Sequence, residues 1–477
     1  MSPQDELLGP QPGTFSGVKF YIKNGAFRVL TAGSWGVEER NPTTCWNEVF
    51  GLYSQAKSCG LPARTSAAST AIQTYLERFD GKDGHPSLRQ LPSRWRGIAH
   101  SSLHGGPIVV TRGGAEDAVQ IDINKAYLAA LREPMPILGV EDDHKVGGWF
   151  TTDDRRWSTI RKLYGFVDAS IRVLGPTDPE GIPPLPIHDW SGAIYARGYL
   201  RGSWTIASVR EAEDRGELEV LAVHAFAFAP TTRPIFAPLG ELFETLPPVL
   251  SKRLYTRFWG RLGMRGGYIA HTSDKPVEGA VPCSGLWWNW NGVDLTSYEA
   301  GRTYRPDLAA SIASFNHRRV IAATRSFAPG SVIALHVDSI WTDDFAGAAR
   351  MTRKTGLGSW REKRRGPLRF YGVGCYEHDG HLAASGYDAT KNGTLTRERV
   401  LDWLQVENPA HRRSLVKSRV WTGDPAVDMA ARSRPFNLVL DLQTNPVPGW
   451  KIDDEKCWTL GGWARPETNE AAVPETP

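Results

Sequence analysis

The sequence is poor in cysteine and has no long apolar run. Its 477 residues include 5 cysteines, none in C-x-x-C spacing, which argues against a disulfide framework and against a zinc site. No apolar stretch approaches the ~20 residues that cross a bilayer. The first residues contain neither the basic nor the apolar segment of a secretory signal. We therefore expect a cytoplasmic protein with no membrane partner.

The chain also lacks a large excess of either charge. With 56 Lys+Arg against 52 Asp+Glu, the net charge is +4, which is too small to identify a nucleic-acid binder by itself. Basic residues are nevertheless concentrated in 350–369, where Glu362 is the one acid, and again in 412–419. Such clusters suit contact with phosphates, although a solvated surface explains either cluster equally well. The 18 tryptophans fit core packing or stacking on bases.

One acid stands at the end of a predicted strand. In AVQIDINKAYLAAL, apolar and polar residues alternate from Val119 to Ile123, and helical spacing follows from Ala126. Asp122 is therefore expected near a strand end, just before a helix. A carboxylate there can hold Mg²⁺, which prefers oxygen ligands, or it can cap the helix.

A second segment repeats this pattern. In SVIALHVDSIWTDD, alternation from Ile333 to Val337 predicts a strand that ends near Asp338. If this strand lies beside that of Asp122, the two carboxylates can share two metal ions ~3.5–4 Å apart, which would clamp the reacting oxygens of a phosphoryl transfer. The alternative is that Asp338 only ends a strand at a turn.

A third segment, SKRLYTRFWGRLGM, has helical spacing. Lys252, Thr256 and Trp259 fall on one face of the predicted helix. A lysine beside an aromatic ring can bind a triphosphate and stack on a base. An exposed amphipathic helix with an extended lysine explains the same spacing.

Together and in order, these segments resemble motifs A, B and C of family B DNA polymerases, most closely the protein-primed branch of phages and linear plasmids. Motif A of that family reads D-x-N-S-L-Y, and Asp122, Asn124 and Tyr127 keep its spacing. Motif B reads K-x-x-x-N-S-x-Y-G, in which Lys252 and Gly260 match. The resemblance covers about 96–390.

Motif C and the linker before motif A also resemble the family. Motif C reads D-T-D-S; Asp338 and Ser339 match, while His336 replaces the first acid. The sequence LHGG, which ends in Gly105 and Gly106, is similar to the family's Y-x-G-G linker.

The segment GLGSWREKRRGPLRFYGVGCYE resembles the strand pair that ends in the family's K-x-Y element. Tyr376 matches the tyrosine of that element, while Gly374 replaces its lysine. The nearby basic residues, Arg364 and Arg365 among them, could compensate for the lost grip on the primer.

The resemblance implies a DNA-directed DNA polymerase whose partners are a DNA primer–template, dNTPs and a candidate terminal protein. Asp122 and Asp338 would hold two Mg²⁺ ions, for which Mn²⁺ could substitute, with the Ile123 carbonyl as a further ligand. Tyr127 would exclude a 2′-hydroxyl, and Lys252 would contact the triphosphate. The implied nucleotide-binding residues are Ile123, Asn124, Tyr127, Lys252, Thr256 and Trp259, and the implied primer–template contacts are Gly105, Gly106, Gly260, Arg364, Arg365 and Tyr376.

The same resemblance implies an α+β fold of the right-hand type, with an antiparallel palm sheet. No D-x-E, with which the family's exonuclease opens, occurs in the first 95 residues, so we expect no proofreading. The implied parts are a reduced N-terminal region (1–95), a palm with motif A (96–235), fingers with motif B (236–263), a palm with motif C (264–390), a thumb-like region (391–465) and a disordered tail (466–477).

Several departures from the family leave the function open. The fingers are short, because only 15 residues separate Phe236 from Lys252, and the family's second basic triphosphate contact is missing. His336 and Gly374 are further departures. An active polymerase of a phage or mobile element, working in the bacterial cytoplasm, is favoured because both acids are kept. The alternatives are a catalytically degenerate fold that binds nucleic acid or a replication partner, and a primase-like polymerase.

Overall fold

The computed structural model describes most of the region from residue 42 to residue 384. Its internal gaps are 83–87, 89–92, 139–148, 152–156, 179–180, 190–191, 230, 264–267, 272–287, 291–292, 298–302 and 373–374, and it also describes 6–8, 18–23, 26–31, 35–37, 395–398 and 457–459. Gly374, the tail and nearly all of the thumb-like region lie outside the described residues. No described helix is long and apolar enough to cross a membrane.

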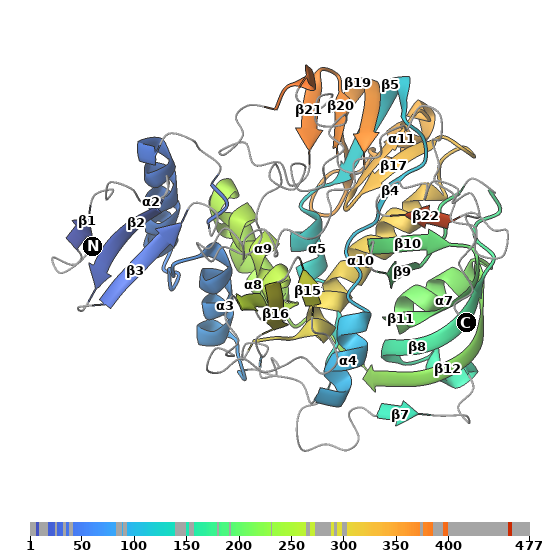
Figure 1. The fold of residues 1–477 in the computed structure, drawn as a ribbon, viewed down its shortest axis with the longest axis horizontal. Helices are drawn as coiled ribbons and strands as arrows, with labels where there is room; N and C mark the ends of the chain where they lie inside the picture. The colour runs from blue at the N-terminus through green and yellow to red at the C-terminus, as the bar shows by residue number, and fades with distance from the viewer. Residues whose placement is uncertain are drawn as a thin grey trace, which may run out of the picture.

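A seven-stranded antiparallel sheet forms the upper part of the molecule in Figure 1. The predicted strands that carry the two acids are both found in it, and they are separated by one strand. In spatial order the sheet contains β21 (His381–Ala384), β20 (Cys375–His378), β19 (Trp360–Gly372), β5 (Gly114–Ile123), β18 (Ser339–Thr342), β17 (Val332–His336) and β4 (Ile108–Val110).

The alternation seen in the sequence gives this sheet two different faces. Val119, Ile121 and Ile123 of β5 are buried against the helices α10 (Pro306–Thr324) and α11 (Phe345–Met351). The opposite face of β5 carries Gln120 and Asp122. One face is therefore closed by helices, and the other carries Gln120 and Asp122 beside a second hydrophobic cluster that includes Ala118, Trp341 and Phe370.

A second antiparallel sheet lies below the first one in Figure 1. Its strands, in spatial order, are β11 (Gly198–Thr205), β8 (Tyr164–Val173), β12 (Leu218–Ala229) and β7 (Trp149–Thr151), and α7 (Ile206–Asp214) covers it. Smaller elements complete the fold: β1 (Glu6–Leu8), β2 (Val18–Lys23), β3 (Ala26–Thr31), α4 (Ser93–Ser101), β6 (Met135–Pro136), α6 (Trp157–Ile160), β9 (Pro186–Asp189), β10 (Gly192–Ala196), β13 (Thr232–Arg233), β14 (Tyr268–His271), β15 (Trp288–Trp290), β16 (Val293–Ser297) and β22 (Cys457–Thr459).

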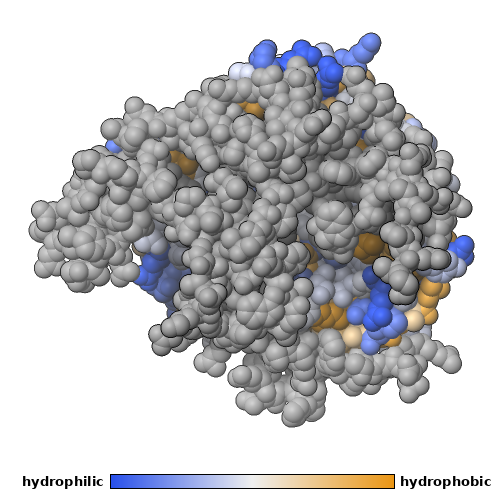
Figure 2. Space-filling model, in the orientation of Figure 1, coloured by the Kyte–Doolittle hydropathy of each residue, from blue (hydrophilic) through white to orange (hydrophobic). Residues whose placement is uncertain are grey.

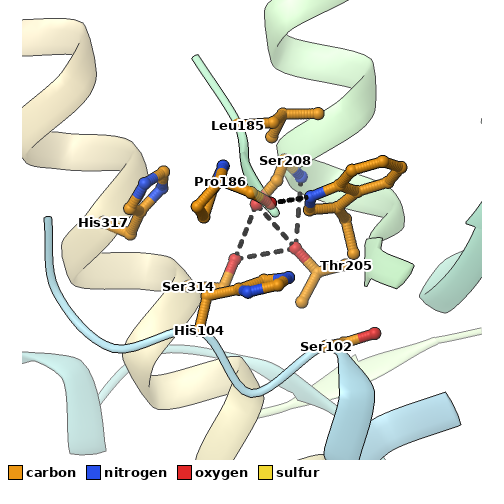
Figure 3. Close-up of a pocket in the computed structure, with 9 residues that line it drawn as sticks. Ser102, His104, Leu185, Pro186, Thr205, Ser208, Ser314 and His317 are labelled. Atoms are coloured by element: carbon orange, nitrogen blue, oxygen red, sulfur yellow. Dashed lines mark hydrogen bonds between the residues drawn. The ribbon is translucent and has the colours of Figure 1, made fainter. Parts of the chain in front are cut away.

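Buried hydroxyl groups join α10 to this second sheet. Figure 3 shows Ser314 of α10 beside Thr205 and Ser208, with oxygen–oxygen distances of 2.7 and 2.9 Å. One turn further along α10, Nε2 of His317 lies 3.0 Å from the hydroxyl of Tyr195. Because buried polar groups are costly unless they are hydrogen-bonded, these pairs fix where α10 docks. The helix below the acids is thereby anchored on both of its sides.

The N-terminal helices pack against the predicted fingers, as Figure 1 shows on the left of the molecule. One of these helices begins directly after Ser66, whose hydroxyl accepts a hydrogen bond from the Ser69 N–H at 3.0 Å. The helices that share this core are α2 (Pro42–Ser58), α3 (Ala67–Arg78), α5 (Ala126–Leu131), α8 (Ala237–Thr245) and α9 (Pro248–Leu262).

Three aromatic rings lie at the centre of this core. Tyr75 of α3 meets Phe236 edge to face at 5.2 Å between ring centroids, and Phe236 meets Phe258 of α9 in the same way at 5.0 Å. All three side chains are fully buried. Such pairs add to the free energy gained from burial, so the motif B helix is fixed to the N-terminal region.

We expect Phe258→Ala to lower the free energy of unfolding by about 3–5 kcal/mol, because it leaves a cavity where α3 meets α9. Val249→Ala on the same helix is the control, since that side chain is 59% exposed and surface changes stay within about 0.5 kcal/mol. Urea unfolding curves of both variants measure the difference. Equal stabilities would contradict this packing.

Candidate active site

The two predicted acids meet at one end of the large sheet. Ser339 is the register partner of Asp122, and the Ile123 N–H donates to the Asp338 carbonyl at 3.0 Å. Asp122 is 6% exposed. Burial, followed by the negative charge of Asp122, raises the pKa of Asp338 to about 6. The carboxylates therefore lie within each other's field, while their role in metal binding stays a prediction.

A tight turn between β17 and β18 presents Asp338. Val337 in this turn has a φ of 61°, which is unfavourable for a β-branched residue. Its N–H donates to the Pro107 carbonyl at 2.7 Å. A Cβ atom on Gly106 would lie 2.6 Å from the Val337 Cα, so only glycine fits there, whereas no described atom lies within 4 Å of such a Cβ on Gly105. The backbone at Gly106 thus packs directly against the turn that carries Val337 and Asp338.

Two basic side chains of β19 reach Asp122. Arg361, the register partner of Asp122, donates from Nε to Oδ1 at 2.7 Å and from Nη2 to Oδ2 at 3.4 Å. The Nζ atom of Lys363 lies 3.7 Å from Oδ2. The sequence placed both residues only within a basic cluster. Their pairing with Asp122 depends on strand register between segments 239 residues apart, which no local pattern encodes.

His336 contributes no charge to the site near neutral pH. Burial, followed by the charge of Lys363, lowers the pKa of the imidazole to about 4. The ring lies edge to face with Trp341 at 6.4 Å. His336 is therefore neutral and packed against an aromatic ring.

The donor groups of this site fit Mg²⁺. Within the described part of the chain, no three His, Cys, Asp or Glu side chains gather around a possible metal position. Mg²⁺ is commonly held by only one or two protein carboxylates together with waters and substrate phosphates. The repulsion between Asp122 and Asp338 is relieved when a cation lies between them. The carboxylate pair thus meets the number of protein ligands that Mg²⁺ commonly uses, and metal binding stays a prediction.

The helices α5 and α9 bring the predicted nucleotide-binding residues beside the acids. Tyr127 and Trp259 stack in parallel, 4.6 Å between centroids and 8° between planes. Burial and the charge of Asp338 raise the pKa of Tyr127, and the charge of Lys252 acts on Asp338 in turn. The Thr256 hydroxyl instead donates to the Lys252 carbonyl at 2.6 Å. Three of these predicted residues, Tyr127, Lys252 and Trp259, therefore converge, whereas the Thr256 hydroxyl is bonded within its own helix.

Tyr255 also lies near Asp338, and the sequence patterns did not identify it as a site residue. Burial and the charge of Asp338 raise the pKa of its hydroxyl, and the charge of Arg361 opposes the shift. Its position three residues after Lys252, about one turn along α9, is the sequence feature that could have identified it, because such residues share a helix face. Gly260 lies further along α9, and no described atom comes within 4 Å of a Cβ built there.

Ile123 and Asn124, two predicted nucleotide-binding residues, also make contacts that stabilise the fold around the site. The Ile123 side chain is buried in the core between the sheet and α10. The Asn124 side chain donates to the Gly356 carbonyl at 2.8 Å, and its backbone N–H donates to the Ser359 carbonyl at 2.8 Å. Asn124 thereby holds the loop that leads into β19 and its basic side chains.

The face that carries the acids continues into an aromatic and basic strip. Arg364 pairs in register with Gln120 and so lies on the Asp122 side of the sheet. Tyr376 lies edge to face with Trp341 at 5.1 Å. Figure 2 shows hydrophilic residues at this rim of the molecule, where Figure 1 places β19, β20 and β21.

Arg365 lies on the opposite face of the sheet. It pairs in register with Val119, its guanidinium lies 4.1 Å from the centroid of the Phe345 ring, and it forms an ion pair with Asp117 at 3.4 Å. The structure therefore does not bring this predicted primer contact to the acids.

Substitution of Gly106 by alanine should damage the site, because the new Cβ would push Val337 and the neighbouring Asp338 out of place. We expect a loss of about 1–3 kcal/mol in the free energy of unfolding, as in other overpacked positions. Gly105→Ala is the matched control and should unfold like the wild type. Thermal unfolding of both variants measures the effect, and equal midpoints would contradict the close approach.

Comparison with known proteins adds evidence on the fold. No family model and no curated protein matches the sequence. Among solved structures, the orthorhombic crystal form of Phi29 DNA polymerase matches with a TM-score of 0.51 and 12% identity, over 80% of this chain and 72% of that one. Its ternary complex with primer-template DNA and incoming nucleotide substrates matches with a TM-score of 0.54 and 12% identity, over 75% of this chain and 66% of that one.

The complex of that polymerase with single-stranded DNA matches similarly, with a TM-score of 0.52 and 13% identity. At such low identity a likeness shows the fold and leaves the activity to be tested. The chain thus has a mixed helix and sheet structure, with a large antiparallel sheet, that is similar to the fold of a protein-primed family B DNA polymerase.

Proposed function

We propose that this protein is a DNA-directed DNA polymerase that transfers a nucleotide from a dNTP to a primer 3′-hydroxyl. The observation that carries the proposal is the meeting of Asp122 and Asp338 at one sheet end, opposite the helix of Lys252. The fold supports it, because similar structures were solved with primer-template DNA and incoming nucleotides. We further propose that it lacks proofreading and replicates phage or mobile-element DNA in the bacterial cytoplasm.

The metal-binding residues in this proposal are Asp122, Asp338 and the Ile123 carbonyl. Bound Mg²⁺ would supply Lewis-acid stabilisation of the attacking and leaving oxygens, and Mn²⁺ could replace it. The chain's own part is to hold two carboxylates in fixed positions, the buried Asp122 on β5 and the half-buried Asp338 in the turn between β17 and β18. Partial burial strengthens the attraction of each carboxylate for a cation.

The nucleotide would bind between the acids and α9. Lys252 is exposed and close enough to Asp338 to lower the pKa of its carboxyl, so its ammonium group is placed to neutralise charge on a leaving pyrophosphate. The stacked rings of Tyr127 and Trp259 offer a flat surface for the sugar and the nascent base pair. In that position Tyr127 would exclude a 2′-hydroxyl.

Primer and template would follow the face of the large sheet that carries Asp122. Arg364 and Tyr376 lie along this face, and the backbone at Gly105 and Gly260 has open space beside it. We assign the palm to the two sheets, the fingers to α8 and α9, and a thumb-like role to 391–465. A terminal protein remains a candidate partner.

One observation favours a second function, a polymerase-like fold that binds nucleic acid without catalysis. Arg361 and Lys363 neutralise Asp122 in the absence of metal, and His336 is neutral. A site with this charge balance could bind phosphates without a divalent cation. Metal-dependent incorporation of dNTPs separates the two functions.

Primer extension with Mg²⁺ or Mn²⁺, a labelled primer–template and four dNTPs tests the proposal. We expect template-directed growth by the wild type and a loss of about 10³-fold or more in Asp122→Asn, because one ligand supplies several kcal/mol of transition-state stabilisation through the metal. Glu116→Gln on the same strand, an exposed position, should keep its activity. Equal rates in all three proteins would contradict the proposal, and an inactive wild type that still binds DNA would favour the second function.

A further inference from the structure

The pair formed by Arg361 and Asp122 uses both carboxylate oxygens. Nε and Nη2 of Arg361 approach Oδ1 and Oδ2 at 2.7 and 3.4 Å, the side-by-side geometry that suits a guanidinium and a carboxylate. The Arg361 side chain is 58% exposed, while that of Asp122 is 8% exposed. The carboxylate is therefore fixed, and the arginine is the partner that can leave.

A divalent cation on Asp122 would compete with this guanidinium. Both need the same oxygen lone pairs, and two cations on one carboxylate repel each other. Lys363 lies on the same side of Asp122 at 3.7 Å, so a metal ion would meet two positive charges. Arg361 makes the closer contact with Asp122, so its guanidinium is the group that a metal ion would displace first.

The region around Arg361 includes the helix α9. The charge of Arg361 acts on the Tyr255 hydroxyl, and Tyr255 precedes Trp259 by one turn on the helix that also carries Lys252. In the sequence, the short fingers lack the second basic residue expected to contact the triphosphate. A guanidinium beside this helix face can supply that contact, because its fork matches phosphate oxygens as well as it matches carboxylates.

We propose that Arg361 exchanges partners during the reaction, holding Asp122 before the metal binds and contacting the triphosphate of the incoming nucleotide afterwards. This inference rests on the proposed function. It assigns to a strand of the sheet a contact that the fingers do not provide. The exchange breaks the hydrogen bonds from Arg361 to Asp122 and forms new ones to the triphosphate, and no covalent bond changes.

The exchange predicts opposite effects on two ligands that can be measured separately. In Arg361→Gln, Mn²⁺ alone, followed by electron paramagnetic resonance, should bind roughly tenfold more tightly, because its competitor is gone. The same variant should bind dATP in the presence of Ca²⁺ roughly tenfold more weakly, because a charge-assisted contact is lost. Equilibrium dialysis with labelled dATP measures the second value without turnover.

Two further variants serve as controls. Arg361→Lys keeps the charge without the fork and should bind dATP with an affinity between those of the wild type and Arg361→Gln. Arg201→Gln removes an exposed arginine that forms an ion pair with Asp168 at 3.7 Å in the second sheet, and it should change neither affinity. Damage to the fold would weaken both ligands together, so the opposite signs distinguish exchange from a structural role.

Shifts of the same sign in Arg361→Gln, or no shift in either affinity, would overturn the exchange. Tighter Mn²⁺ binding with unchanged dATP binding would also overturn it, because Arg361 would then be a counter-ion only. Primer extension by the wild type is scored separately. If Arg361→Gln shows the opposite shifts in Mn²⁺ and dATP affinity but the wild type extends no primer, the result would support the exchange of partners and refute the polymerase function.

Discussion

The hydrogen bonds between β5 and β18 hold two carboxylates of like charge in each other's field. Left alone, Asp122 and Asp338 would repel each other, and this repulsion adds to the burial that is the larger cause of the raised pKa of Asp338. The strand pairing prevents them from moving apart. The basic side chains of Arg361 and Lys363 lie beside Asp122 for this reason, because buried negative charges need nearby positive charges.

Two distant parts of the chain keep this constraint in place. Gly106 approaches the turn at Val337 so closely that no side chain fits between them. On the other side, the core formed by α3 and α9 fixes the helix that carries Lys252 opposite the acids. The N-terminal helices thus act on the site through packing, since the contacts described for Tyr75 reach α9 and not the acids.

Local patterns in the sequence predicted the elements of the site well. Alternation around Asp122 and Asp338 located the strands, and helical spacing located α9, because both periods are properties of the backbone itself. Register was not predictable in the same way. A β-bulge between Glu362 and Arg364 breaks the alternation of β19, so that Arg364 shares a face with Asp122 while Arg365 faces the helices.

The same limit explains why the pairing of Arg361 with Asp122 was not seen in the sequence. It joins residues 239 positions apart, and a shift of one residue would have turned the arginine to the other face. Tyr255 was missed for a different reason, since a buried aromatic residue on a helix is read first as part of the core. The thumb-like region and Gly374 stay predictions.

The most direct test of the central claim is a crystal structure of the protein with Mn²⁺, primer–template DNA and a non-hydrolysable dNTP, with the metal located by anomalous scattering. The account predicts an anomalous peak within ~2.5 Å of carboxylate oxygens of both Asp122 and Asp338, and Arg361 turned from Asp122 to the triphosphate. Mn²⁺ bound elsewhere, with Arg361 still paired to Asp122, would contradict it.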